Sequence, residues 1–169
     1  MIRLAGLLRD SIVDGPGIRA TIFAQGCPHR CHGCHNPETW NFDDGTSMDE
    51  EQVLEIVRTN PLCHGVTFSG GEPFAQAEGF AKLARLLKAA GYEVASYSGY
   101  TFEELYGAKD ARRNLLDELD VLIDGPFVEE ERSLELNFRG SRNQRILNVP
   151  ESLAQGEAVP ETTDRWLGL

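Results

Sequence analysis

The chain has no long hydrophobic run and no excess of positive charge. No window approaches the ~18 apolar residues that a membrane-spanning helix needs, and the start, Met1 to Gly6, contains no apolar stretch that ends at a small-residue cleavage site. Its 16 lysines and arginines stand against 27 aspartates and glutamates, which gives a net charge of −11. We therefore expect a cytoplasmic protein that neither enters a membrane nor binds nucleic acid through a basic surface.

Cysteines are also few, and there is no second close pair of them. Three of the four cysteines lie within eight residues, as Cys27-Pro-His-Arg-Cys31-His-Gly-Cys34. Disulfides rarely persist in the cytoplasm, so this spacing favours metal binding or redox chemistry over a disulfide framework. Cys63 stands alone before an apolar run, and we expect it to be a buried free thiol.

Internal repeats, low-complexity tracts and long linkers are absent from the 169 residues, a length that suggests one domain. From Arg19 onward, short β-rich segments alternate with helical ones, which predicts right-handed βαβ units and an α/β fold with a mostly parallel sheet. The last segment is acidic and irregular, so we expect a main domain over 1–150 and an acidic C-terminal tail over 151–169. The predicted strands are 20–23, 66–68, 92–97, 121–123 and 145–147, and the predicted helices follow capping boxes at 47–50 and 101–104 or cover 76–90 and 115–119.

Unusual polar or glycine-rich segments follow four of these strands. They are the cysteine loop, the turn Ser69-Gly-Gly-Glu-Pro73, the pair Ser98-Gly99 and the pair Asp124-Gly125. In parallel sheets, ligands bind at the carboxyl ends of the strands. The sequence therefore predicts one site at one edge of the sheet.

The cysteine loop itself admits three interpretations. A helix with a buried cysteine face is disfavoured because Gly33 and Pro37 would disrupt it. A structural zinc ion needs four ligands, and a nearby histidine or Cys63 would have to supply the fourth. A cubane iron–sulfur cluster takes up to four thiolates, so three cysteines would leave one iron free to bind something else. We favour the cluster and keep a non-catalytic zinc-binding module as the alternative.

The combination of a C-x3-C-x2-C loop with the Gly-Gly-Glu-Pro turn resembles the signature of the radical S-adenosylmethionine enzymes. More narrowly, the chain resembles the activating enzymes of anaerobic (class III) ribonucleoside-triphosphate reductases. The segments that carry the likeness are Asp14–Arg19, Gln25–Asn36 with Thr39 and Trp40, Ser69–Pro73, Ser98–Tyr100, Asp124–Phe127 and Arg139–Arg145.

The resemblance implies a fold, a reaction and partners. The fold would be an open partial (β/α) barrel of the radical-SAM type, and Cys27, Cys31 and Cys34 would ligate three irons of a 4Fe–4S cluster. S-adenosylmethionine would occupy the fourth iron, and its reductive cleavage would give a 5′-deoxyadenosyl radical. That radical would remove a hydrogen atom from a glycine of the partner, the anaerobic ribonucleoside-triphosphate reductase. A flavodoxin- or ferredoxin-type protein would donate the electron.

The same resemblance implies a set of cofactor contacts. The glycines of the Gly-Gly-Glu-Pro turn would let the backbone approach the ligand closely, and its glutamate would accept from the ammonium group. No general acid or base is required, since cluster and cofactor carry the chemistry. The cofactor-binding residues implied are Gly33, Cys34, His35, Gly70, Gly71 and Glu72.

Some assignments stay open on the sequence alone. Asp14-Gly-Pro-Gly17 is either a simple turn or a contact with the partner, and Asp124 either caps a loop or touches the cofactor. The Arg139–Arg145 segment is either a solvated patch or a docking or carboxylate contact. Activators of other glycyl-radical enzymes often carry an inserted ferredoxin-like domain with extra cysteines, and only Cys63 is left over here. Activation of such an enzyme remains an alternative function.

Overall fold

The computed structural model describes residues 1–168. One seven-stranded sheet has the order β3-β1-β2-β4-β5-β6-β7. The strands are β1 (Ile2–Ser11), β2 (Arg19–Ala24), β3 (Thr46–Met48), β4 (Gly65–Gly70), β5 (Glu93–Tyr97), β6 (Val121–Asp124) and β7 (Arg145–Asn148). The α-helices are α1 (Glu50–Arg58), α2 (Ala77–Ala89), α3 (Phe102–Tyr106), α4 (Ala111–Glu118), α5 (Val149–Gln155) and α6 (Asp164–Leu167), with short 3-10 turns η1 (Pro37–Thr39), η2 (Pro73–Gln76) and η3 (Glu129–Glu131).

The four central strands, β2, β4, β5 and β6, run parallel. Helices α1, α2 and α4 lie in the crossovers between them, as the alternating pattern predicts, so the α/β class is confirmed. β1 and β3 on one side and β7 on the other add antiparallel strands. β1 and β3 are not among the predicted strands, because the apolar and polar residues of 2–11 alternate only as far as Leu4 and β3 has three residues.

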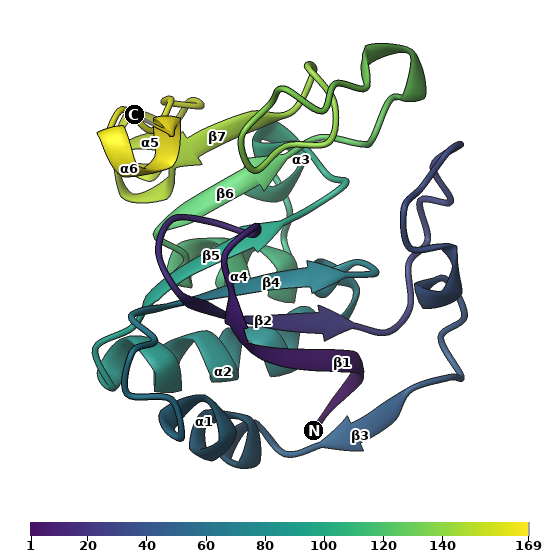
Figure 1. Ribbon diagram of the computed structural model, residues 1–169. Coiled ribbons are helices and arrows are strands. Elements are labelled where there is room, and N and C mark those ends of the chain that lie inside the picture. Colours follow the sequence, from purple (N-terminus) through teal and green to yellow (C-terminus); the bar gives the residue numbers. More distant parts are fainter. Residues whose placement is uncertain (169) are drawn as a thin grey trace.

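A hydrophobic core lies between the sheet and the helices on one of its faces (Figure 1). On α2, the side chains of Phe80, Leu83, Ala84 and Leu87 are fully buried, as the predicted apolar stripe requires. Phe80 packs edge-on against Phe68 of β4, with the ring centroids 4.9 Å apart. Burial of each such large side chain contributes about 1.5–3 kcal/mol, which fixes α2 against the sheet.

One local expectation needs correction. The helix after residue 47 does not begin with a capping box from Ser47 to Glu50. Ser47 lies in β3, paired with Arg3, and the box that starts α1 is formed by Asp49 and Gln52. Pairing of Thr46–Met48 with β1 therefore delays the start of α1 by two residues. The expected capping box from Thr101 to Glu104 is present at the start of α3.

The segment after residue 150 packs on the sheet. The boundary expected at 150 falls inside α5, and Trp166 of α6 is only 1% exposed. Trp166 packs edge-on against Phe138 and lies under the guanidinium of Arg19. The buried side chain of Trp166 thus attaches this acidic segment to the rest of the domain.

The carboxyl ends of the parallel strands share one side of the molecule. The arrows of β2, β4, β5 and β6 point to the same side in Figure 1, where the segment after β2 and the segment after β6 also lie. The fold therefore places four loops where the sequence predicts a site.

None of the helices within residues 1–168 could span a membrane.

Candidate active site

A cavity of about 190 Å³ lies at these strand ends, and all three clustered cysteines line it. Each of the four predicted segments contributes to its wall. The lining residues include Cys27, Cys31, Cys34, His29, His35, Ser69, Gly70, Gly71, Ser98, Gly99, Gly125, Phe127 and Gln144. The expected convergence of the four segments at this edge is confirmed, except that Asp124 itself is not part of the lining.

The cysteine loop is an irregular turn. The amide of Cys34 donates to the carbonyl of Cys31 over 3.1 Å, and Arg30 and Gly33 both have left-handed backbone, with φ of 50° and 76°. A non-glycine residue at positive φ is uncommon and clusters at functional sites. The turn brings three half-buried thiols to the wall of one cavity, so they are not the buried face of a helix.

The donor set of this wall suits a thiolate-bound cluster. Burial raises the pKa of the Cys27 thiol, and the carboxylate of Glu72 raises it further, against backbone hydrogen bonds that lower it. Metal binding must therefore displace a proton there. No three His, Cys, Asp or Glu side chains within residues 1–168 are grouped closely enough for one ion. A 4Fe–4S cluster makes a different demand, because each thiolate binds a different iron.

The Gly-Gly-Glu-Pro turn packs directly on the start of the cysteine loop. The amide of Gly71 donates to the carbonyl of Ala24, and that of Glu72 to the carbonyl of Gly26, both over 2.8 Å. Gly70 has a φ of 87°, and a Cβ there would lie 2.6 Å from the amide nitrogen of Ala24. A Cβ on Gly71 would overlap the carbonyl of Gly26. The two glycines thus allow the close approach of two chain segments; their contact with a cofactor stays a prediction.

Glu72 lies behind the cavity wall and is only 1% exposed. Its carboxylate accepts hydrogen bonds from His29 Nε2 (2.5 Å), from the hydroxyl of Ser98 (3.0 Å) and from the amides of Gly99 (2.7 Å) and Phe74 (3.1 Å). From the sequence, Glu72 is expected to contact the cofactor, whereas His29 is considered only as one candidate for the fourth ligand of a zinc ion. The position of His29 between two cysteines was its only sequence signal.

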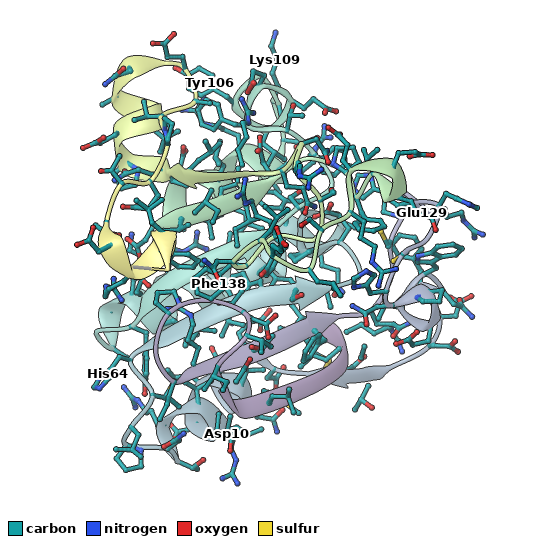
Figure 2. All side chains as sticks on the ribbon, turned by 45° about the horizontal axis from the view of Figure 1, so that its top comes forward. Asp10, His64, Tyr106, Lys109, Glu129 and Phe138 are labelled. Atoms are coloured by element: carbon teal, nitrogen blue, oxygen red, sulfur yellow. The ribbon has the colours of Figure 1, made fainter. Side chains whose placement is uncertain are left out.

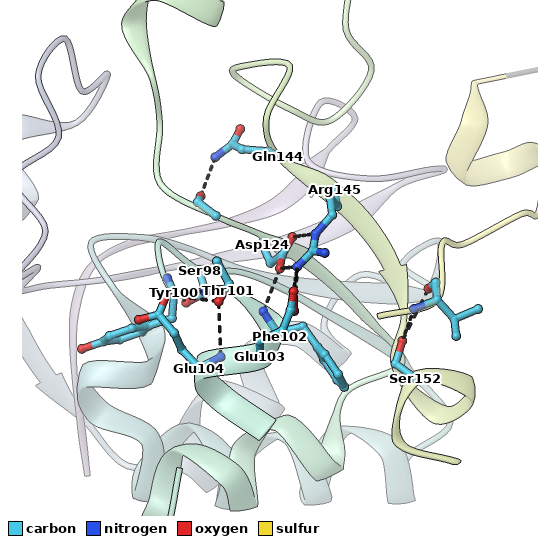
Figure 3. A network of polar contacts seen from close by, with 12 residues as sticks. Ser98, Tyr100, Thr101, Phe102, Glu103, Glu104, Asp124, Gln144, Arg145 and Ser152 are labelled. Carbon is cyan, nitrogen blue, oxygen red and sulfur yellow. Dashed lines mark hydrogen bonds and ion pairs between the residues drawn. The ribbon is translucent and has the colours of Figure 1, made fainter. Parts of the chain in front are cut away.

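Asp124 serves the scaffold in this structure. Its fully buried carboxylate accepts from the amide of Phe102 at 2.7 Å and from Arg145 Nε at 3.0 Å (Figure 3). Arg145 also pairs with Glu103 at 2.9 Å. Hydrogen bonds to Asp124 and then to Glu103 raise the pKa of the Arg145 guanidinium. Of the two open interpretations, the structure supports the loop-capping one, since this network joins β6, β7 and α3.

The Arg139–Arg145 segment forms a wall of the cavity. Gln144 accepts from the amides of Gly140 (2.9 Å) and Ser141 (3.2 Å) and donates to the carbonyl of Gly125 (3.1 Å). These bonds attach the segment to the loop after β6. Gln144 and Gly140 both line the cavity, so this part of the segment is not only a solvated surface patch.

Two other cysteine-loop neighbours face outward. Gly33 is exposed and absent from the lining, while His32 is 91% exposed and pairs with Glu129 at 3.0 Å. His35 lines the cavity and packs edge-on against Phe127 at 5.1 Å. The predicted contacts of Gly33, Cys34 and His35 with the cofactor stay predictions.

Cys63 is far from this site. It is 5% exposed, and its thiol donates to the carbonyl of Gly65 over 3.1 Å. It precedes the six-residue strand β4, so at ~3.3 Å per residue it lies roughly 20 Å from the strand's carboxyl end. In Figure 2, the neighbouring His64 lies on the opposite side of the molecule from Glu129, which contacts the cysteine loop. The expected buried free thiol is confirmed.

Two comparisons with known proteins, one with family models and one with single relatives, indicate the same family. Residues 13–147 match the family model described as a 4Fe-4S single cluster domain. The anaerobic ribonucleoside-triphosphate reductase-activating protein of Vibrio cholerae is 34% identical over 143 residues, covering 80% of this chain and 90% of the relative. The Escherichia coli (strain K12) protein of the same name is 33% identical over 143 residues, covering 80% and 91%.

A pyruvate formate-lyase-activating enzyme from Clostridium pasteurianum is 34% identical over 151 residues, which is 84% of this chain but only 60% of that enzyme. The reductase-activating relatives are thus similar in length to this chain, and the lyase-activating relative is longer. The matched region contains the cysteine loop and every strand end that lines the cavity. The chain belongs to the 4Fe-4S single cluster domain family and, within it, to the anaerobic ribonucleoside-triphosphate reductase-activating proteins.

Proposed function

We propose that this protein is a radical S-adenosylmethionine enzyme that generates the glycyl radical of an anaerobic ribonucleoside-triphosphate reductase. The observation that carries the proposal is that Cys27, Cys31 and Cys34 share one cavity with the Gly70-Gly71 turn at the ends of parallel strands. The family match supplies the reductase as the protein substrate.

In this proposal the thiolates of Cys27, Cys31 and Cys34 would hold a 4Fe–4S cluster. When bound, the cluster would supply the electron for the reductive cleavage of S-adenosylmethionine. The chain's own task is to position and enclose the two groups. Gly70 and Gly71 line the cavity without side chains, and Phe127 and Gln144 line it from the segments after β6 and before β7.

The fold and the partners follow from the same proposal. The parallel strands β2, β4, β5 and β6 correspond to part of an open (β/α) barrel of the radical-SAM type. A flavodoxin- or ferredoxin-type donor in the cytoplasm would reduce the cluster. Activation of a different glycyl-radical enzyme is the less favoured function, because the chain covers 60% of the lyase-activating relative but about 90% of the reductase-activating ones.

The test is activation of the partner. Anaerobically reconstituted protein, reduced and supplied with S-adenosylmethionine, should produce a glycyl-radical signal in electron paramagnetic resonance when the reductase is added. Without the reductase it should still release 5′-deoxyadenosine. A colourless protein that contains one tightly bound zinc ion would refute the radical mechanism, and a radical that forms on pyruvate formate-lyase but not on the reductase would change the partner.

A further inference from the structure

One buried carboxylate links the ends of three neighbouring strands. Glu72 follows β4, Ser98 and Gly99 follow β5, and His29 lies in the loop after β2. We infer that His29 is a positioning residue, which clamps the cysteine loop to the rest of the site through Glu72. The clamp is a property of the protein alone, whereas its consequence for cofactor binding rests on the proposed function.

The carboxylate of Glu72 has no free capacity. An ionised carboxylate offers about four acceptor sites, and four donors contact Glu72, with the single hydroxyl hydrogen of Ser98 shared between its two oxygens. His29, Gly99 and Ser98 contact Oε1, while Ser98 and the amide of Phe74 contact Oε2. An ammonium group could bind this carboxylate only after one of these donors moved away. The geometry therefore favours a structural function for Glu72 over a direct contact with the cofactor.

Within this set, His29 is the donor that comes from the cysteine loop. Its Nε2 lies 2.5 Å from Glu72 Oε1, and its side chain is only 18% exposed. The ring also packs edge-on against Tyr100, with centroids 4.6 Å apart at an interplanar angle of 75°. A Cβ on Gly99 would lie 2.5 Å from the ring, so the residue after Ser98 must be small. Hydrogen bond, aromatic neighbour and glycine together hold the ring in one place.

The location of His29 makes this contact useful. It lies two residues after Cys27 and two before Cys31, next to Arg30 with its left-handed backbone. Holding its ring therefore restrains the part of the loop that separates two proposed cluster ligands. By contrast, His32 in the same loop is 91% exposed and contacts only the half-exposed Glu129. His32 is the matched control.

The first experiment is a double-mutant cycle on S-adenosylmethionine affinity, measured by equilibrium dialysis with the oxidised, cluster-loaded protein so that no turnover occurs. The clamp predicts that His29→Leu and Glu72→Gln each weaken binding by about ten-fold, the scale of one charge-assisted hydrogen bond. The double variant should be no weaker than either single one. His29→Gln, which keeps a donor near the Nε2 position, should recover most of the affinity.

Direct binding of the ammonium by Glu72 predicts a different pattern. His29→Leu would then bind as tightly as the wild type, or more tightly, and only Glu72→Gln would lose affinity. That result would overturn the clamp. His32→Leu should match the wild type in either case, because its side chain contacts neither Glu72 nor the cavity.

The second experiment uses the metal-free protein and does not depend on catalysis. Amide hydrogen exchange over 27–36 should be about ten-fold faster in His29→Leu and in Glu72→Gln than in the wild type, and unchanged in His32→Leu. Unchanged exchange in His29→Leu would overturn the clamp. If the exchange result holds but no variant or wild type binds S-adenosylmethionine, the proposed function fails and the clamp stands.

Discussion

The four cysteines of this chain occupy two unlike environments. Cys27, Cys31 and Cys34 are half-buried around one cavity, whereas Cys63 is buried in the hydrophobic core at the amino end of β4. A thiol at the wall of a cavity can be deprotonated and bind metal, while a thiol in an apolar core stays inert. The three cysteines of the loop follow the carboxyl end of β2, whereas Cys63 precedes the amino end of β4.

This difference predicts opposite outcomes for two alanine substitutions. Cys31→Ala should abolish 5′-deoxyadenosine release, since one iron loses its protein ligand. Cys63→Ala should leave cluster content and cofactor cleavage unchanged and cost about 1–2 kcal/mol of unfolding free energy through the small cavity it creates. Iron analysis and product assay after anaerobic reconstitution check both. Normal cleavage by Cys31→Ala, or loss of iron in Cys63→Ala, would contradict the three-cysteine assignment.

At the scale of elements, the turn after β4 and the loop after β2 form one unit. The amides of Gly71 and Glu72 bind carbonyls of the β2 end, and the amide of Gly26 donates to the carbonyl of Thr39 over 2.7 Å. The turn that carries the Gly-Gly pair therefore also supports the cysteine loop. A substitution of Gly70 or Gly71 should therefore disturb the cysteine loop although the cysteines themselves are unchanged.

Gly71→Ala tests this coupling. A Cβ at position 71 overlaps backbone atoms of Gly26, which cannot rotate away as a flexible side chain would. We expect a loss of about 2–3 kcal/mol in unfolding free energy and poor cluster retention during gel filtration. Gly107→Ala is the control, because its Cβ would lie 3.4 Å from the nearest atom, the carbonyl of Glu103. Equal stability of the two variants would mean that the turn and the loop move independently.

The secondary structure was predictable to different extents along the chain. The five strands from 20 to 147 have local signals, either apolar β-branched runs or flanking turn residues, and all five exist. β1 and β3 lack such signals, because the apolar residues of β1 alternate with polar ones only as far as Leu4 and β3 has three residues, two of them polar. Their strand conformation shows only in the pairing of the folded chain, such as Leu4 with Ala24 and Ile2 with Met48.

At the scale of the whole molecule, two ion pairs that share Glu93 join β2, β5 and α6. Arg19 of β2 is 2% exposed and pairs with Glu93 of β5 at 2.9 Å, and Arg165 of α6 pairs with the same carboxylate. Burial alone would raise the pKa of Glu93, but Arg19 and Arg165 outweigh it, and the pKa is lowered. The pair thereby connects β2, β5 and the C-terminal segment.

The lowered pKa makes stability depend on pH in a definite direction. Glu93 releases its proton more readily in the folded than in the unfolded chain, so its contribution is complete above the ordinary glutamate pKa of about 4.3 and is lost as the pH falls through the folded value. Urea unfolding of the metal-free protein should show a lower unfolding free energy at about pH 3.5 than at pH 7. Glu93→Gln should be less stable at pH 7 and show a smaller acid-induced loss. An equal acid-induced loss in this variant would exclude Glu93 as a contributor.

The proposed ligands and the edge of the sheet where they lie were predictable without a structure. Both are local facts: three cysteines in eight residues stay close whatever the fold, and loops that follow parallel strands meet at the same edge. Which side chains meet at that edge depends on the folded chain. There Glu72 binds His29, Ser98 and Gly99, and Asp124 lies against Arg145. These contacts join residues about 20 to 45 positions apart, and their distances depend on strand order and register, which no segment of the sequence encodes alone.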